Sequence, residues 1–184
     1  MNTLPGVWLD DLTRQEVASR LDGNAVVLVP VVLAGTPAPH LPLKTAALIA
    51  RALGQALLQR LPVVLAPVID ADSFSRPEML ERVLGDRLDG LRALGARRIV
   101  VLEISPSPLG TPQVLADGLV VRAGDRLADD EYVTSCLMAL DPRSVRMPLL
   151  PASSRSQAFA GERGMSAEVD EIATAVVSKW PDLI

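Results

Sequence analysis

Apolar residues form unbroken runs in the first half of this chain and recur at helical spacing near its end. The runs, rich in Val, Ile and Leu, occupy residues 25–32, 62–69 and 97–104. Such runs are typical of strands that are buried on both faces. Residues 45–60, rich in Ala and Leu, and residues 77–94 lie between them and are predicted to be helices. This β-α-β-α-β order predicts a parallel sheet with right-handed crossovers.

Capping side chains and a glycine mark the ends of several predicted helices. Thr13–Glu16 has the capping-box sequence and opens a short helix that ends near Leu21. Thr45 can cap the helix that follows the first strand. Ser75–Glu78 is a second capping box, and Gly95 ends the helix that it opens.

The second half of the chain is less regular. Three prolines predict a loop at 105–112, and residues 114–121 fit either one strand or a hairpin. Residues 129–140 are predicted to be a helix whose first turn carries acids that complement the helix dipole. Residues 148–165 are predicted to be a long surface loop. The last helix is expected to follow a Ser166 cap.

Composition predicts a single domain spanning residues 1–184 and excludes some functions. The net charge is −4, which argues against nucleic acid as a partner because phosphate binding needs a basic surface. No apolar run approaches the roughly 20 residues of a membrane span, and no signal peptide opens the chain. Cys136 is the only cysteine and falls in an apolar helical stretch, which favours packing and a cytoplasmic location.

Five segments together resemble the creatininase (creatinine amidohydrolase) family. Residues 30–46, PVVLAGTPAPHLPLKTA, align without a gap with that family's first signature segment. The other four segments are 8–21, 95–102, 134–145 and 161–168, and all five have the order and spacing of the family's segments. The resemblance implies a three-layer α/β/α fold with a mostly parallel central sheet. It also implies an amidohydrolase with two divalent metals, such as Zn or Mn, that assembles into oligomers.

The positions that would carry the family's chemistry are all changed in this chain. Those that can be placed are Gly35, Pro37, Ala46, Ser105, Ala128 and Val133. By the resemblance, four of them would hold metal ligands and the last two a catalytic His and Glu. Gly, Pro and Ala cannot hold a divalent cation through a side chain. The sequence therefore predicts a degenerate member without a metal cofactor.

A few polar residues remain as candidates for a different chemistry. His40, the only histidine, could act as a base or could order its proline-rich loop. Ser105 could be a nucleophile, but it would need a base within hydrogen-bond reach. Glu103, Asp70 and Asp72 lie near the ends of predicted strands, so they could share a cleft and act as acid and base or bind a hard cation.

Three functions follow from these observations. The first is a pseudoenzyme subunit that forms a homo-oligomer, or a hetero-oligomer with an active creatininase-like relative that it scaffolds or regulates. The second is a repurposed hydrolase of a small amide or cyclic imide that uses Glu103, Asp70 or Asp72 in the ancestral cleft. The third is a module that binds a small molecule in the emptied, more apolar pocket.

Overall fold

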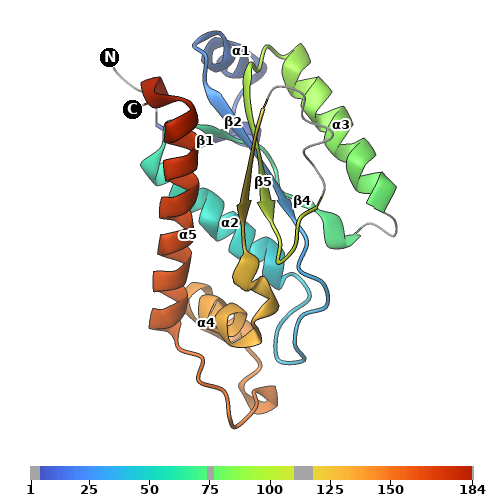
Figure 1. Ribbon diagram of the computed structural model, residues 1–184, viewed down its shortest axis with the longest axis vertical. Helices are drawn as coiled ribbons and strands as arrows, with labels where there is room; N and C mark the ends of the chain where they lie inside the picture. The colour runs from blue at the N-terminus through green and yellow to red at the C-terminus, as the bar shows by residue number, and fades with distance from the viewer. Residues whose placement is uncertain (1–4, 74–76, 110–117, 184) are drawn as a thin grey trace.

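A computed structural model describes residues 5–73, 77–109 and 118–183 and shows a parallel sheet between two layers of helices (Figure 1). The strands run in the spatial order β1-β3-β2-β5-β6, and β4 also pairs with β2. Every pairing is parallel. The strands are β1 Val7–Trp8, β2 Val26–Val32, β3 Val64–Leu65, β4 Ile69–Asp70, β5 Arg98–Ile104 and β6 Leu119–Ala123. The α-helices are α1 Arg14–Asp22, α2 Thr45–Arg60, α3 Pro77–Ala93, α4 Asp130–Leu140 and α5 Ala158–Lys179.

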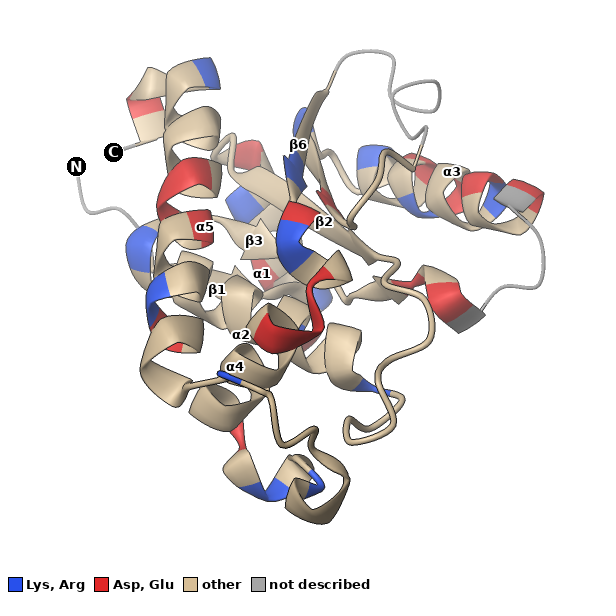
Figure 2. Cartoon of the chain, turned by 60° about the horizontal axis from the view of Figure 1, so that its bottom comes forward, with Lys and Arg blue, Asp and Glu red and all other residues tan. Residues whose placement is uncertain are grey.

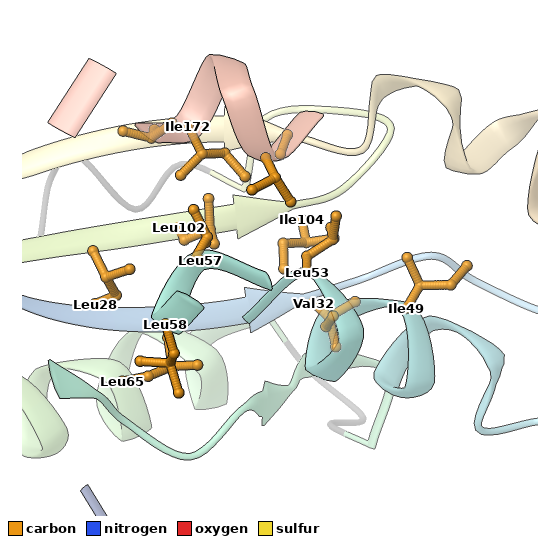
Figure 3. Close-up of a cluster of buried hydrophobic side chains, with 14 of the residues drawn as sticks. Leu28, Val32, Ile49, Leu53, Leu57, Leu58, Leu65, Leu102, Ile104 and Ile172 are labelled. Carbon is orange, nitrogen blue, oxygen red and sulfur yellow. The ribbon is translucent and has the colours of Figure 1, made fainter. Parts of the chain in front are cut away.

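Alternate residues of the central strands enter two separate cores. Val26, Leu28 and Leu102 pack with α2, α4 and α5, and Figure 3 shows part of this cluster. Val27 and Val101 point to the other face and pack with α1 and α3. Because both faces of the sheet are covered, the strands are apolar throughout. The three-layer α/β/α fold with a mostly parallel sheet is confirmed.

The predicted strand at 62–69 is two short strands, β3 and β4, and Pro30 explains the gap between them. Ala66 donates its N–H to the Leu28 carbonyl of β2 over 2.8 Å. In a parallel strand, the backbone groups of alternate residues form hydrogen bonds with the same neighbouring strand. The even-numbered residues of β2 therefore direct their N–H and carbonyl groups toward β3. Pro30 is the next even residue and has no N–H to donate. Pairing stops there and resumes where Val31 and Val32 meet β4.

Three expected helix starts had different outcomes. The capping box at Thr13–Glu16 is present, and α1 begins at Arg14. The Thr45 cap was wrong, because Thr45 is the first residue of α2 and its hydroxyl donates to the Pro42 carbonyl over 2.6 Å. The capping box at Ser75–Glu78 begins outside the described residues, although Pro77 does open α3.

The predicted surface loop at 148–165 ends at Gln157 and was wrong beyond it, and the Ser166 cap was wrong. Helix α5 already begins at Ala158, so Ser166 lies inside it. Gly161 and Gly164 lie in this first part of α5 and allow it to approach α4 closely. A Cβ atom on Gly161 would lie 2.2 Å from the backbone of Ser135. Residues 118–121 include the start of β6, which pairs with β5 in parallel, whereas 114–117 lie outside the described residues.

Candidate functional site at the carboxyl ends of the strands

Four of the six changed positions meet at one small cavity beyond the carboxyl ends of the strands. Gly35 and Pro37 come from the loop after β2, Ala46 from the first turn of α2, and Val133 from α4. Parallel α/β folds bind ligands at this edge. The cavity offers only about 30 Å³ to the centres of water molecules, which is room for about two waters. The positions converge as a shared site would require, but the space between them is nearly filled.

The other two changed positions do not line this cavity. Ser105 is 1% exposed, and its N–H donates to the Ala123 carbonyl over 2.9 Å. Its Oγ accepts from the N–H of Ser107. Ala128 is exposed in a short 3-10 helix, Asp125–Ala128, that leads to α4. In the described residues the His40 ring contacts Thr134 and not Ser105. Ser105 therefore has no imidazole base within hydrogen-bond distance.

The donor set at the small cavity does not fit a pair of divalent cations. Among the described residues that line it, Asp130, the first residue of α4, is the only one with an ionisable side chain. Nowhere in the described ranges do three His, Cys, Asp or Glu side chains gather closely enough to hold a metal ion. Zinc sites use several Cys, His or carboxylate ligands converging on one point. The residues present therefore do not fit the metals that the resemblance implies.

His40 connects the loop before α2 to helix α4. Its ring Nε2 lies 2.7 Å from Oγ1 of Thr134, and that hydroxyl donates its own proton to the Asp130 carbonyl over 2.6 Å. Because a hydroxyl has a single proton, Nε2 must be the donor to Thr134. The His40 carbonyl also accepts the N–H of Arg146 over 2.9 Å. With the residue 4% exposed, this geometry suits an ordered loop rather than a base acting through Nε2.

Asp72 holds the loop after β2. One carboxylate oxygen accepts the N–H of Ala34 and the other accepts the N–H of Gly35, each over 3.0 Å. Gly35 has a φ of +74°, in the left-handed region that favours glycine. A glutamate at position 35 would be strained in this backbone conformation. Replacing Gly35 by the glutamate that the resemblance expects would therefore not by itself recreate a metal ligand.

Glu103 and Asp70 lie in surroundings different from that of Asp72. Glu103 is 1% exposed and shares the strand parity of Val101, so it faces the α1 and α3 layer. Its Oε2 accepts the N–H of Leu109 over 3.3 Å and lies 3.9 Å from Nε of Arg122. Asp70 instead borders a different, larger cavity beside Trp8. The structure thus distributes the three acids around the sheet edge rather than gathering them in the small cavity.

A buried polar pair between α4 and α5 was missed in the sequence. The Tyr132 hydroxyl donates to Oε1 of Glu168 over 2.9 Å, whereas Oε2 of Glu168 is buried without a partner in the described part of the chain. Burial raises the pKa of the Glu168 carboxyl, and the Tyr132 hydrogen bond only partly offsets this. Burial also raises the pKa of the neighbouring Cys136 to about 11, so its thiol stays protonated at neutral pH.

Asp130 was interpreted from the sequence only as a helix-start acid. Helical spacing could have revealed more, because residues three and four apart share a face. Asp130, Val133 and Thr134 have that spacing. The structure places the first two at the small cavity and the third against His40.

Solved structures of creatininases share this fold. A glutamate-to-glutamine creatininase variant of the "Zn-Zn type" matches with a TM-score of 0.78 and 16% identity, covering 95% of this chain and 98% of that chain. A crystal structure of creatinine amidohydrolase matches with a TM-score of 0.75 and 16% identity, over 95% and 98% of the two chains. A structure named "Creatininase Mn" gives 0.73 and 16%, over 96% and 99%.

The fold is therefore creatininase-like, and at such low identity the likeness concerns the fold alone. No protein-family profile and no curated protein sequence matches the chain. Across the ranges that the structure describes, none of the helices is both long enough and apolar enough to span a bilayer.

Proposed function

We propose that this chain is a creatininase-like protein that has lost the two-metal amidohydrolase chemistry and works as a non-catalytic, cytoplasmic binding subunit. The observation that carries the proposal is the small cavity. Four positions at which the resemblance expects metal ligands or a catalytic acid meet there as Gly35, Pro37, Ala46 and Val133. Their side chains offer no lone pair to a cation, and the space left holds about two waters.

The remaining polar groups at this edge support the same conclusion. Asp72 is engaged with two backbone N–H groups, and His40 donates to Thr134. Groups that could do acid–base chemistry are used instead to hold the loops around α2 and α4. A protein can keep a fold and its surfaces after losing a site, because fold and function are separable.

The expected partner is a creatininase-like relative that retains its metals, or further copies of this chain. Such a subunit would scaffold or regulate the active one. The two alternatives have less support. A repurposed hydrolase would need Glu103, Asp70 and Asp72 in one cleft, and they lie in three surroundings. A small-molecule module in the emptied pocket would need more room, since ligand pockets have about 300–1,000 Å³.

Metal loading tests the proposal directly. The purified chain is incubated with excess Zn²⁺ or Mn²⁺ and dialysed, and its metal content is measured together with creatinine hydrolysis. We expect only trace metal and no hydrolysis above the rate in buffer. A creatininase with its metal site treated in parallel controls for loss of metal during dialysis. More than half an equivalent of retained metal, or metal-dependent turnover, would overturn the proposal.

Native purification tests the partner. The chain is expressed at its natural level with an affinity tag, and co-eluting proteins are identified by mass spectrometry. We expect a stoichiometric creatininase-like protein that carries metal, or additional copies of this chain. A chain that elutes alone as a monomer would contradict the subunit role and leave the metal result unaffected.

A further inference from the structure

The segment between α4 and α5 presents a basic and apolar tip, defined here as residues 143–149. Met147 and Leu149 are 57% and 59% exposed. Arg143 and Arg146 precede them in the chain, are exposed, and form no ion pair with any described residue. The Arg146 guanidinium donates to the backbone carbonyls of Arg143 and Ser144. Figure 2 shows basic residues on these turns at the bottom of the molecule. Apolar side chains rimmed by charge are typical of protein interaction sites.

Local hydrogen bonds hold the tip in one shape. Its first turn is capped by Asp141, whose carboxylate accepts the N–H of Arg143. The N–H of Arg146 donates to the His40 carbonyl over 2.9 Å, and the N–H of Leu149 donates to the Arg146 carbonyl over 2.8 Å. An ordered segment loses little conformational freedom when a partner binds. The tip is therefore prepared for docking rather than free to fold back over its apolar side chains.

A second surface of the same chain has the opposite charge. An open cavity of about 450 Å³ lies where β1 and β4 end and α2 begins, and we call it the acidic cavity. Trp8 and Val68 supply apolar wall, and Asp10, Asp11 and Asp70 supply three carboxylates. Of the described residues in its lining, Arg51 alone is a cation, so the carboxylates are in excess there.

The tip and the acidic cavity complement each other in charge and in apolar surface. The tip offers two exposed apolar side chains and two guanidinium groups, and the cavity offers an apolar wall beside excess carboxylates. No tip residue lines the acidic cavity of its own chain. We propose that a second copy of this chain inserts its tip into the acidic cavity, with Met147 or Leu149 against Trp8 and Arg143 and Arg146 facing Asp10 and Asp11.

This contact is independent of whether the chain has lost catalysis, since neither surface includes the small cavity. It is heterologous, because two different patches meet. Such contacts close into a ring when the rotation permits and otherwise grow into filaments. Exposed charge pairs are weakened by salt, whose screening length is about 10 Å at 0.1 M. Association should accordingly decrease as salt is added.

A charge-swap experiment tests the proposal. Mass in solution is measured by light scattering after size exclusion for three proteins: the wild type, the tip variant Arg143→Glu with Arg146→Glu, and the cavity variant Asp10→Lys with Asp11→Lys. We expect the wild type to associate and each variant to bind itself about ten-fold more weakly or worse. An equimolar mixture of the two variants should associate again, because the new acids of one then face the new lysines of the other.

The control is Glu81→Lys with Asp86→Lys on α3, which changes net charge as the cavity variant does and should leave association unchanged. Far-UV circular dichroism verifies that every variant is folded. A wild type that stays monomeric at all concentrations would mean that the tip serves another partner and would overturn the proposal. So would variants that associate as the wild type does, or a mixture that shows no recovery.

Discussion

At the scale of single residues, polar side chains in this protein mostly hold backbone in place. Asp72 fixes the turn at Ala34 and Gly35, and His40 ties its loop to Thr134. Glu168 differs, because one of its oxygens is buried without a partner in the residues described. A buried carboxylate that lacks hydrogen bonds is costly when charged. The raised pKa of Glu168 is the expected response, and it makes stability depend on pH.

Glu168→Gln should remove that dependence. A carboxyl with a raised folded-state pKa stabilises the fold fully below its unfolded pKa, near 4.5, and this contribution is lost as pH rises through the folded value. The free energy of unfolding of the wild type should therefore fall relative to Glu168→Gln between about pH 5 and about pH 8. Glutamine keeps an acceptor for the Tyr132 hydroxyl.

Urea denaturation of both proteins at the two pH values measures this difference. Glu162→Gln is the matched control, since Glu162 is an exposed glutamate on the same helix, and its difference from the wild type should stay nearly constant. If the wild type and Glu168→Gln show parallel pH profiles, Glu168 is not held in a costly environment.

At the scale of elements, the packing of α4 against α5 depends on two glycines. A Cβ atom on Gly161 would lie 2.2 Å from the Ser135 backbone, and one on Gly164 would lie 2.4 Å from the Tyr132 ring. The first contact is with backbone, which cannot rotate away as a flexible side chain can. The two helices must separate if Gly161 acquires a side chain.

Gly161→Ala should destabilise the protein by about 3 kcal/mol or more, the upper range for overpacking. Gly90→Ala is the matched control. Gly90 lies in the interior of α3, and nothing stands within 4 Å of its added Cβ atom. This change should stabilise the fold by up to about 1 kcal/mol through helix propensity alone. Thermal denaturation gives both values, and equal stabilities for the two variants would show that α4 and α5 are not tightly packed.

These glycines also show what could and could not be predicted from the sequence. Long apolar runs such as 25–32 and 97–104 predict strands well, because burial on both faces leaves a clear pattern. The first eight residues of α5 were interpreted as loop, because a glycine needed for close packing looks the same as one needed for a turn. Pro67 inside the run 62–69 is a local sign that the strand is interrupted. The contribution of Pro30 comes from a neighbouring strand, and no local pattern reveals it.

The candidate site, like the fold, could be predicted only in part from the sequence. A resemblance of spacing placed Gly35, Pro37, Ala46 and Val133 as related positions, and the structure brings them to one cavity. Spacing along the chain does not reveal which way a side chain points. The sequence left open a cleft shared by Glu103, Asp70 and Asp72, but Glu103 has the strand parity of Val101 and faces the α1 and α3 layer.

At the scale of the whole molecule, one sheet separates two cores. If the chain is a single domain, as predicted, the two cores should unfold together in one cooperative transition. Both tryptophans, Trp8 and Trp180, pack on the α2 and α5 side. Leu84 of α3 is fully buried on the other side. Tryptophan fluorescence therefore reports on one layer while a substitution at Leu84 disturbs the other. A single domain transmits that disturbance through β2 and β5, which serve both cores.

Leu84→Ala should cost about 2–5 kcal/mol, the range for removing a buried leucine side chain. In one cooperative domain, the fluorescence midpoint in urea falls as far as the midpoint seen by far-UV circular dichroism, although both tryptophans lie across the sheet. Leu94→Ala, at a side chain 43% exposed, should change the free energy of unfolding by about 0.5 kcal/mol or less and hardly move either midpoint. If Leu84→Ala moves the dichroism midpoint and leaves the fluorescence midpoint in place, the α1 and α3 layer unfolds on its own. The sheet would then not couple its two faces.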